Sequence, residues 1–104
     1  MGRVSNKITL AQIIQINRQM IHTFGGIFFE ADQNLLKRGS LEYALEEIDA
    51  VLFGEELHPN LFEKAATLIY KIIIGHVFHD GNKRTGLATG QLLIMMNGYD
   101  LPLH

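Results

Sequence analysis

The sequence contains no cysteine and carries no large excess of one charge. Without cysteine the chain has no disulfides, no zinc–thiolate sites and no thiol nucleophile, and it suits a reducing compartment such as the cytoplasm. The formal net charge is -2, with acidic and basic residues spread along the chain. This balance excludes the strong basic field that binds nucleic acid or anionic lipid. We therefore expect a cytoplasmic protein that does not bind nucleic acid directly.

Long hydrophobic runs are also missing. The longest apolar stretch, around Ile72 to Ile74, is far too short to span a bilayer. Met1 to Lys7 is polar and lacks the apolar core of a signal peptide. The 104 residues show no repeat or linker, and 47% of them are hydrophobic. The sequence thus predicts one soluble domain over residues 1–104, with a single core and no membrane partner.

Hydrophobic periodicity and capping signals predict an all-α bundle of four helices. The first helix runs from about Thr9 to Phe24, and Thr9 with Gln12 forms a capping box at its start. The second helix runs from Leu41 to about Leu52, with Ser40 as its N-cap. Between these helices, Ile27 to Phe29 fits either a short strand or a loop held by its aromatic residues.

The third helix is the most apolar segment of the chain. Asn60 and Glu63 form a second capping box, and the helix continues to about Phe78. Its polar residues form one narrow stripe: Lys64, Thr67 and Lys71. A helix of this composition is expected to be surrounded by the other helices.

The last helix runs from near Lys83 to about Asn97. Gly86 and Gly90 lie four residues apart on one face, although each costs the helix about 1 kcal/mol relative to alanine. We expect this face to pack tightly against the third helix.

The connection between the last two helices collects most of the chemically versatile side chains. It leads into a helix N-terminus, where free N–H groups and the helix dipole favour an anion. Gly81 permits a positive φ and a close approach by that anion. Lys83 and Arg84 oppose the helix dipole, and a bound phosphate would turn this cost into an advantage. Such a local conflict is typical of a functional site.

Two further side chains extend this hypothesis. Asp80 is a candidate ligand for a Mg²⁺ that bridges phosphate oxygens, and His76 is a candidate general base facing the same cavity. Phe78 is expected to anchor the turn in the core, and His79 to face solvent. His76 fits equally well as a helix C-cap, and each other residue of the loop, taken alone, fits a turn or a solvated surface.

The whole set resembles the signature of the Fic/Doc family, which reads H-x-F-x-[DE]-[GA]-N-[GK]-R. All seven specified positions match within His76 to Arg84. The resemblance covers most of the chain from about residue 9 to 100, and it implies an all-helical Fido fold with the active loop between two central helices. It implies that His76 is the general base and Asp80 the Mg²⁺ ligand, with a short β-flap near residues 27–30. It further implies a phosphate cradle formed by Gly81, Asn82, Lys83 and Arg84.

Two positions resemble the Doc-like "death on curing" members rather than those that transfer AMP. AMP-transferring members usually have glycine in place of Lys83 and a second arginine in place of Leu87. The resemblance therefore implies a kinase that transfers the γ-phosphate of ATP to a Ser or Thr of a protein such as elongation factor Tu. Adenylyl transfer is the alternative.

The resemblance also implies a regulatory partner. The inhibitory pattern [ST]-x-x-x-E-[GN] of many Fic proteins is absent from the sequence, so inhibition is expected from another chain, a Phd-like antitoxin whose tail folds on binding. Doc-type chains usually continue beyond the last helix, so we expect a chain that is short at its C-terminus. Self-association or a partner would cover the apolar surface that this leaves.

Parts of the sequence also fit three other interpretations. An HD-type metallophosphohydrolase would use the adjacent His79 and Asp80, but the further ligands it requires are poorly placed. A P-loop is rejected because Leu87 stands where lysine is required. A degenerate family member that binds without turnover remains as the second alternative.

Overall fold

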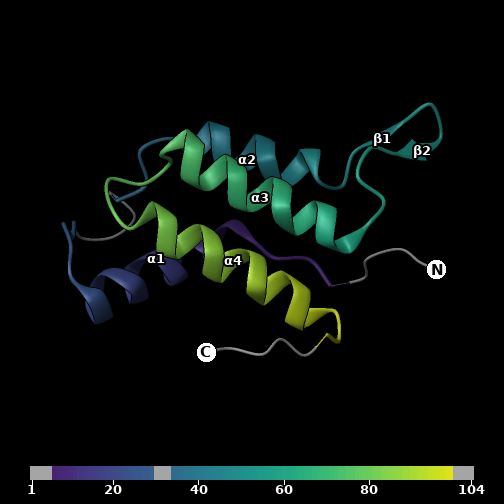
Figure 1. The fold of residues 1–104 in the computed structure, drawn as a ribbon. Coiled ribbons are helices and arrows are strands. Elements are labelled where there is room, and N and C mark those ends of the chain that lie inside the picture. Colours follow the sequence, from purple (N-terminus) through teal and green to yellow (C-terminus); the bar gives the residue numbers. More distant parts are fainter. Residues whose placement is uncertain (1–5, 30–33, 100–104) are drawn as a thin grey trace.

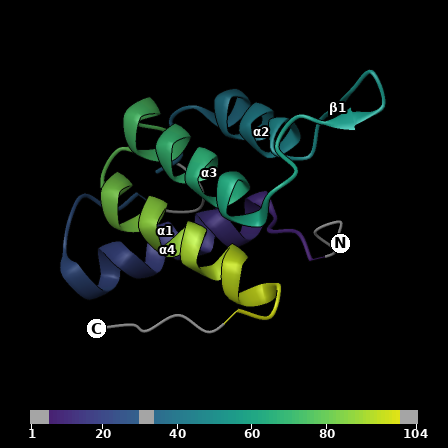
Figure 2. The same cartoon turned by 45° about the vertical axis from the view of Figure 1, so that its right-hand side comes forward.

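The structure is a computed structural model that describes residues 6–29 and 34–99. It confirms the all-helical bundle and adds one short antiparallel hairpin (Figure 1). The elements are α1 (Leu10–Phe24), α2 (Arg38–Glu47), β1 (Val51–Leu52), β2 (Glu55–Glu56), α3 (Leu61–Gly75) and α4 (Asn82–Met96). In two views the hairpin projects from one end of the bundle, whereas the α3–α4 connection lies at the other end (Figures 1 and 2). None of the helices in the described ranges has the length and apolar character of a membrane span.

The start of α1 agrees with the prediction. Thr9 accepts a hydrogen bond from the Gln12 N–H at 3.1 Å, and the Gln12 side chain accepts one from the Thr9 N–H at 2.8 Å. Gly25 ends the helix with a φ of 90°, and its N–H donates to the Ile21 carbonyl. Two of the residues that α1 buries, Ile13 and Ile21, are apolar, as a core-facing helix requires.

The predicted limits of α2 are wrong at both ends. The helix begins three residues earlier, with Lys37 at the N-cap and no capping side chain, so Ser40 lies inside the first turn. It ends at Glu47 because the chain turns there into the hairpin. Phe53 and Gly54 both have positive φ, 53° and 80°, as a two-residue type I′ hairpin turn requires.

Lys64 ties the hairpin and the end of α2 to α3. Lys64 belongs to the predicted polar stripe of the third helix, but the residue is only 1% exposed. The ammonium group donates to the Ile48 carbonyl and lies 3.2 Å from Glu56 and 3.6 Å from Asp49. A buried ammonium requires such partners, since removing it from water is costly.

Replacing Lys64 with methionine is expected to destabilise the fold. Lys64→Met keeps the apolar stem but removes the tether, and we expect a loss of about 1–2 kcal/mol in the free energy of unfolding. Lys71→Met is the matched control, because the Lys71–Glu47 pair at 3.3 Å is 40% exposed on the lysine side and contributes at most about 1 kcal/mol. Urea denaturation of both variants measures this, and equal losses would contradict the tether.

The packing of α3 against α4 confirms the prediction from the two glycines. A Cβ on Gly86 would lie 2.8 Å from Ile73 Cγ1, and one on Gly90 would lie 2.3 Å from Ile69 Cδ1. The two helices therefore approach closely along this face. The helix α3 ends at Gly75 and not at Phe78, because His76 adopts the left-handed conformation.

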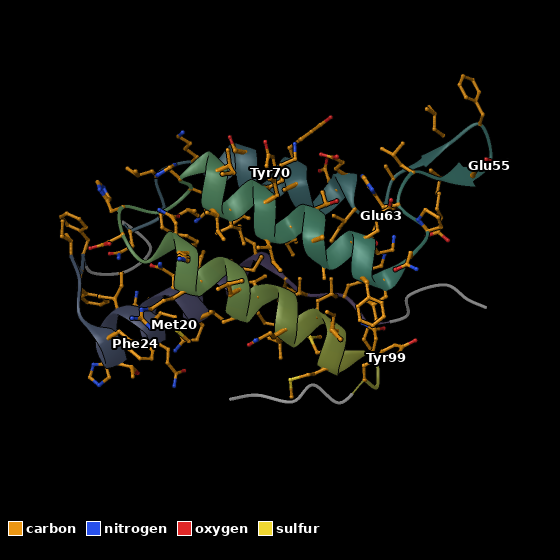
Figure 3. The ribbon with its side chains drawn as sticks, viewed as in Figure 1. Met20, Phe24, Glu55, Glu63, Tyr70 and Tyr99 are labelled. Carbon is orange, nitrogen blue, oxygen red and sulfur yellow. The ribbon has the colours of Figure 1, made fainter. Side chains whose placement is uncertain are left out.

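The expectation that α3 is surrounded is also wrong. Phe62 is 47% exposed, Ile74 59% and Tyr70, labelled in Figure 3, 60%. These residues form an apolar stripe along the outer side of α3, while the neighbouring faces pack against α2 and α4. The apolar residues of α4 do not share one side, since Leu93 is buried and Met95 is 41% exposed.

Candidate active site

An open cavity of about 520 Å³ lies at the N-terminus of α4. Its wall contains all five residues that the sequence analysis placed around a phosphate and its metal ion. The lining residues are Met20, Gly25, Asp80, Gly81, Asn82, Lys83, Arg84 and Leu87. The α3–α4 connection thus forms one side of the cavity, and the end of α1 forms another.

The first turn of α4 offers unsatisfied backbone donors to this cavity. Gly81 is the N-cap, with the predicted positive φ of 74°, and within the described residues no side chain caps the helix. The first intrahelical bond runs from the Thr85 N–H to the Gly81 carbonyl at 2.8 Å. The N–H groups of Asn82, Lys83 and Arg84 precede this bond, so they are available to an anion at the positive end of the helix dipole.

Two cations stand beside these donors. Lys83 and Arg84 are both exposed, and neither forms an ion pair with a carboxylate in the described part of the chain. The Arg84 guanidinium lies 3.9 Å from the ring centroid of Phe24, at the end of α1. This cation–π contact holds the charge at the α1 side of the cavity without neutralising it.

Asp80 is an ionised carboxylate at the edge of the same cavity. Its Oδ2 accepts a hydrogen bond from the Ile27 N–H at 3.1 Å, and its Oδ1 accepts one from the Gly81 N–H at 2.8 Å. These two backbone bonds, the Ile27 bond first, lower the pKa of Asp80 below its usual value despite a small opposing effect of burial. Asp80 therefore stays charged at neutral pH.

The donor set fits a magnesium ion shared with a nucleotide. Within the described residues no three potential ligands cluster to form a metal cage. Mg²⁺ commonly uses one or two carboxylates together with substrate phosphates and water. A single ionised carboxylate beside a phosphate site, as Asp80 provides, meets that requirement.

Asn82 contributes to the cavity through its backbone, because its side chain closes the loop. Its Oδ1 accepts a hydrogen bond from the Phe78 N–H at 2.9 Å, and its Nδ2 donates to the Phe78 carbonyl at 2.8 Å. Phe78 is 1% exposed, so it is the predicted apolar anchor of the turn. The two residues fix the path by which the chain enters α4.

His76 lies outside the cavity lining. It is the C-cap residue of α3, with a φ of 49°, and its ring is exposed. Its Nδ1 lies 3.1 Å from the Ile74 carbonyl oxygen. A carbonyl only accepts, so Nδ1 carries the proton and Nε2 keeps its lone pair in the neutral ring. The capping interpretation therefore holds, and the same bond leaves Nε2 able to take a proton.

The predicted β-flap is wrong for the residues that the structure describes there. Residues 27–29 form a loop, as the alternative prediction had it, and residue 30 lies outside the described ranges. Aromatic contacts hold this loop: the ring centroids of Phe29 and His79 are 4.7 Å apart, and the Arg18 guanidinium lies 5.1 Å from the Phe28 centroid. His79 is exposed, as predicted.

Sequence reasoning missed several residues near the site. Met20 and Gly25 line the cavity, and Phe24 holds Arg84. Asn17 is fully buried beneath the loop, where the only signal was an asparagine on the apolar face of the first helix. Far from the cavity, His58 lies 3.3 Å from Glu47 and 3.9 Å from Glu63 and so links α2 to α3.

Comparison with known proteins agrees with this geometry. Residues 7–94 match the model of the Fic/DOC family. The chain is 31% identical over 86 residues to a Mycolicibacterium smegmatis protein named Toxin Doc, covering 83% of this chain and 66% of the relative. It is also 31% identical over 91 residues to Protein kinase doc of Escherichia phage P1, covering 88% of this chain and 68% of the relative.

The chain therefore spans about two thirds of the length of these relatives. No solved structure matches it. Because the family model covers most of the sequence, including the whole α3–α4 connection, the chain belongs to the Fic/DOC family.

Proposed function

We propose that this chain is a Doc-like protein kinase, the toxin of a toxin–antitoxin pair. It would transfer the γ-phosphate of ATP to a Ser or Thr hydroxyl of a protein such as elongation factor Tu. The observation that carries the proposal is the start of α4. Uncapped N–H groups meet two cations there in one cavity, and within the described residues neither cation pairs with a carboxylate. The names of the two relatives, a toxin and a protein kinase, support the same function.

Binding follows from the charges of the cavity. The triphosphate is expected to accept hydrogen bonds from the first-turn N–H groups of α4, with Lys83 and Arg84 neutralising its charge. Asp80 would hold Mg²⁺, which when bound supplies Lewis-acid stabilisation of the phosphate oxygens. Gly81 has a positive φ, which disfavours residues with a side chain, and as a glycine it lets the phosphate approach the backbone closely.

Transfer then requires a base. His76 Nε2 would take the proton of the target hydroxyl while the hydroxyl oxygen bonds to the γ-phosphorus. The bond from that phosphorus to the β–γ bridging oxygen breaks, and ADP leaves with the released electron pair. An exposed base outside the nucleotide cavity suits a target that is itself a protein, since the hydroxyl approaches from solvent.

Transfer of the γ-phosphate is favoured over transfer of AMP by two lining residues. Lys83 adds a cation near the phosphates, and Leu87 places an apolar side chain in the wall. With ATP labelled at one position, we expect label to reach the target from the γ-phosphate and not from the α-phosphate. Autoradiography of elongation factor Tu measures this, and label from the α-phosphate alone would assign the chain to adenylyl transfer.

The position of His76 favours one alternative, a family member that binds nucleotide without turnover. His76→Ala separates the two functions. A kinase should lose transfer in this variant while the dissociation constant for ATP stays unchanged, because His76 does not line the cavity. A binding protein should transfer no phosphate in either form.

The regulatory partner follows from the proposed function. We propose that a Phd-like antitoxin neutralises the chain in the cytoplasm, since the Mycolicibacterium relative is named as a toxin. Exposed apolar residues on α3, among them Tyr70 and Ile74, offer surface for such a partner or for a second copy.

A further inference from the structure

Two buried asparagines, Asn17 and Asn34, lie beneath the candidate active site. Asn17 is 0% exposed and Asn34 is 2% exposed. In α1 Asn17 lies between the buried Ile13 and Ile21, a position where an apolar side chain would pack better. Burying a carboxamide is costly unless its groups are hydrogen-bonded. The partners of these two side chains therefore indicate what they contribute.

The side chain of Asn34 makes the hydrogen bonds to residues 27–29 that the backbone of a neighbouring strand would make. Its Oδ1 accepts the Phe29 N–H at 2.5 Å, and its Nδ2 donates to the Ile27 carbonyl at 3.1 Å. In a sheet, a neighbouring strand bonds a carbonyl and an N–H two residues apart in the same way. The loop thus keeps an extended path although no strand pairs with it in the described residues.

Asn17 connects Asn34 to the active loop. Its Nδ2 donates to the Asp80 carbonyl at 2.9 Å and to Thr85 Oγ1 at 3.0 Å, and its Oδ1 accepts from Asn34 Nδ2 at 3.4 Å. All four side-chain N–H groups of the two asparagines therefore have acceptors. A satisfied buried network of this kind fixes its members in one arrangement.

Asp80 is hydrogen-bonded both to the loop of residues 27–29 and to Asn17. The Ile27 N–H donates to the Asp80 carboxylate, while Asn17 binds the backbone carbonyl of Asp80. The loop at residues 27–29 is thus held to the active loop both directly and through the asparagines. Its apolar side chains remain 37–55% exposed.

We infer that Asn17 and Asn34 are positioning residues, which set the loop of residues 27–29 at a fixed place relative to the phosphate site. Neither lines the cavity, so neither is expected to contact the nucleotide. The catalytic consequence rests on the proposed function: a correctly placed loop presents the target hydroxyl to the bound ATP. The structural consequence is that losing a hydrogen bond at one end of the network weakens the hydrogen bonds at the other end. This consequence does not depend on the proposed function.

The structural consequence is tested by amide hydrogen exchange at Ile27 and Phe29. Asn34→Ala removes the bond to the Phe29 N–H directly. Asn17→Ala and Thr85→Val cut the network farther away, and Thr85→Val is close in shape to the residue it replaces. We expect exchange at Phe29 to accelerate about three- to tenfold in all three variants, the loss of roughly one hydrogen bond.

Thr89→Val is the matched control. Thr89 is fully buried on α4 like Thr85, one turn further along, but its hydroxyl has no partner in the described residues. We expect unchanged exchange at Phe29 in this variant. The inference would be overturned if Asn17→Ala and Thr85→Val left exchange at Phe29 unchanged. It would also fail if every variant accelerated exchange equally throughout α3 and α4, which is the pattern of a general loss of stability.

A kinetic measurement tests the catalytic consequence. With ATP, Mg²⁺ and elongation factor Tu, we expect Asn34→Ala to raise the KM for the protein target about tenfold while the dissociation constant for ATP stays unchanged. A rise in the ATP constant alone would contradict positioning of the loop. If the wild-type chain transfers no phosphate, the proposed function fails, and the exchange measurement still decides whether the asparagines position the loop.

Discussion

His76→Gly is expected to make the protein more stable and inactive at once. His76 adopts a φ of 49°, a conformation that costs a residue with a Cβ more than it costs glycine. Glycine at this helix C-cap should raise the free energy of unfolding by about 0.5–1 kcal/mol. Loss of the general base should lower phosphate transfer by about 10²–10⁴-fold. Urea denaturation and a transfer assay with γ-labelled ATP measure the two effects.

Phe53→Gly is the matched control for this prediction. Among the described residues, His76 and Phe53 are the two non-glycine residues with a positive φ. Phe53 has a φ of 53° and is 96% exposed at the tip of the hairpin. We expect a similar gain in stability and no change in transfer, because the hairpin lies at the opposite end of the bundle from the active loop (Figure 1). If His76→Gly retained full transfer, His76 would be a helix cap alone.

Gly90→Ala is expected to be strongly destabilising. The added methyl group would lie 2.3 Å from Cδ1 and 2.5 Å from Cγ1 of Ile69, so this isoleucine must move or the two helices must separate. Overpacking of this kind typically costs about 2–3 kcal/mol. Because α4 carries the phosphate site at its start, a shift of the helix should also weaken ATP binding. Denaturation curves and calorimetric titration with ATP measure both effects.

Gly39→Ala is the control within another helix. Apart from its chain neighbours and its own helix backbone, no heavy atom of the described residues lies within 4 Å of the position that a Cβ on Gly39 would occupy, and Gly39 has no positive φ. Alanine there should stabilise the protein by about 0.5 kcal/mol through its helix propensity. Equal effects at Gly39 and Gly90 would show that helix propensity, and not close packing, governs both positions.

The helices that could be predicted from the sequence have strong local signals. The capping box at Thr9 and the asparagine cap at Asn60 place the starts of α1 and α3 correctly. The spacing of Gly86 and Gly90 predicts the close contact between α3 and α4, because a Cβ at either position would clash with an isoleucine of α3. In these places local sequence and tertiary packing favour the same structure.

The errors arose where tertiary contacts override the local pattern. Ser40 is a good N-cap by composition, but α2 begins earlier, where the N–H groups of Leu36 and Lys37 bind the Val77 carbonyl. Val51 and Leu52 continue the apolar pattern of a helix, yet they pair with Glu55 and Glu56 in the hairpin. Lys64 appears polar by residue type, and only its three partners across α2 and the hairpin make its burial favourable.

The candidate site shows the same division. The cluster from Asp80 to Arg84 could be predicted, because consecutive residues at the start of a helix necessarily share one location. His76 was expected to face the cavity, but no sequence rule determines where a side chain points after a left-handed residue. Asn17 binds Asp80, which lies 63 residues away in sequence, and Asn34 binds Asn17, 17 residues away. Hydrophobic periodicity, which is a local pattern, does not predict contacts at such separations.

The most direct test of the phosphate site is an NMR titration of the ¹⁵N-labelled protein with ATP and Mg²⁺. We predict that the largest shifts of backbone amides fall on Asn82, Lys83 and Arg84, the first-turn donors of α4 that face the cavity. Adenosine, which lacks phosphates, should leave these amides unchanged. If ATP moved other amides instead, or none at all, the start of α4 would not be a nucleotide phosphate site.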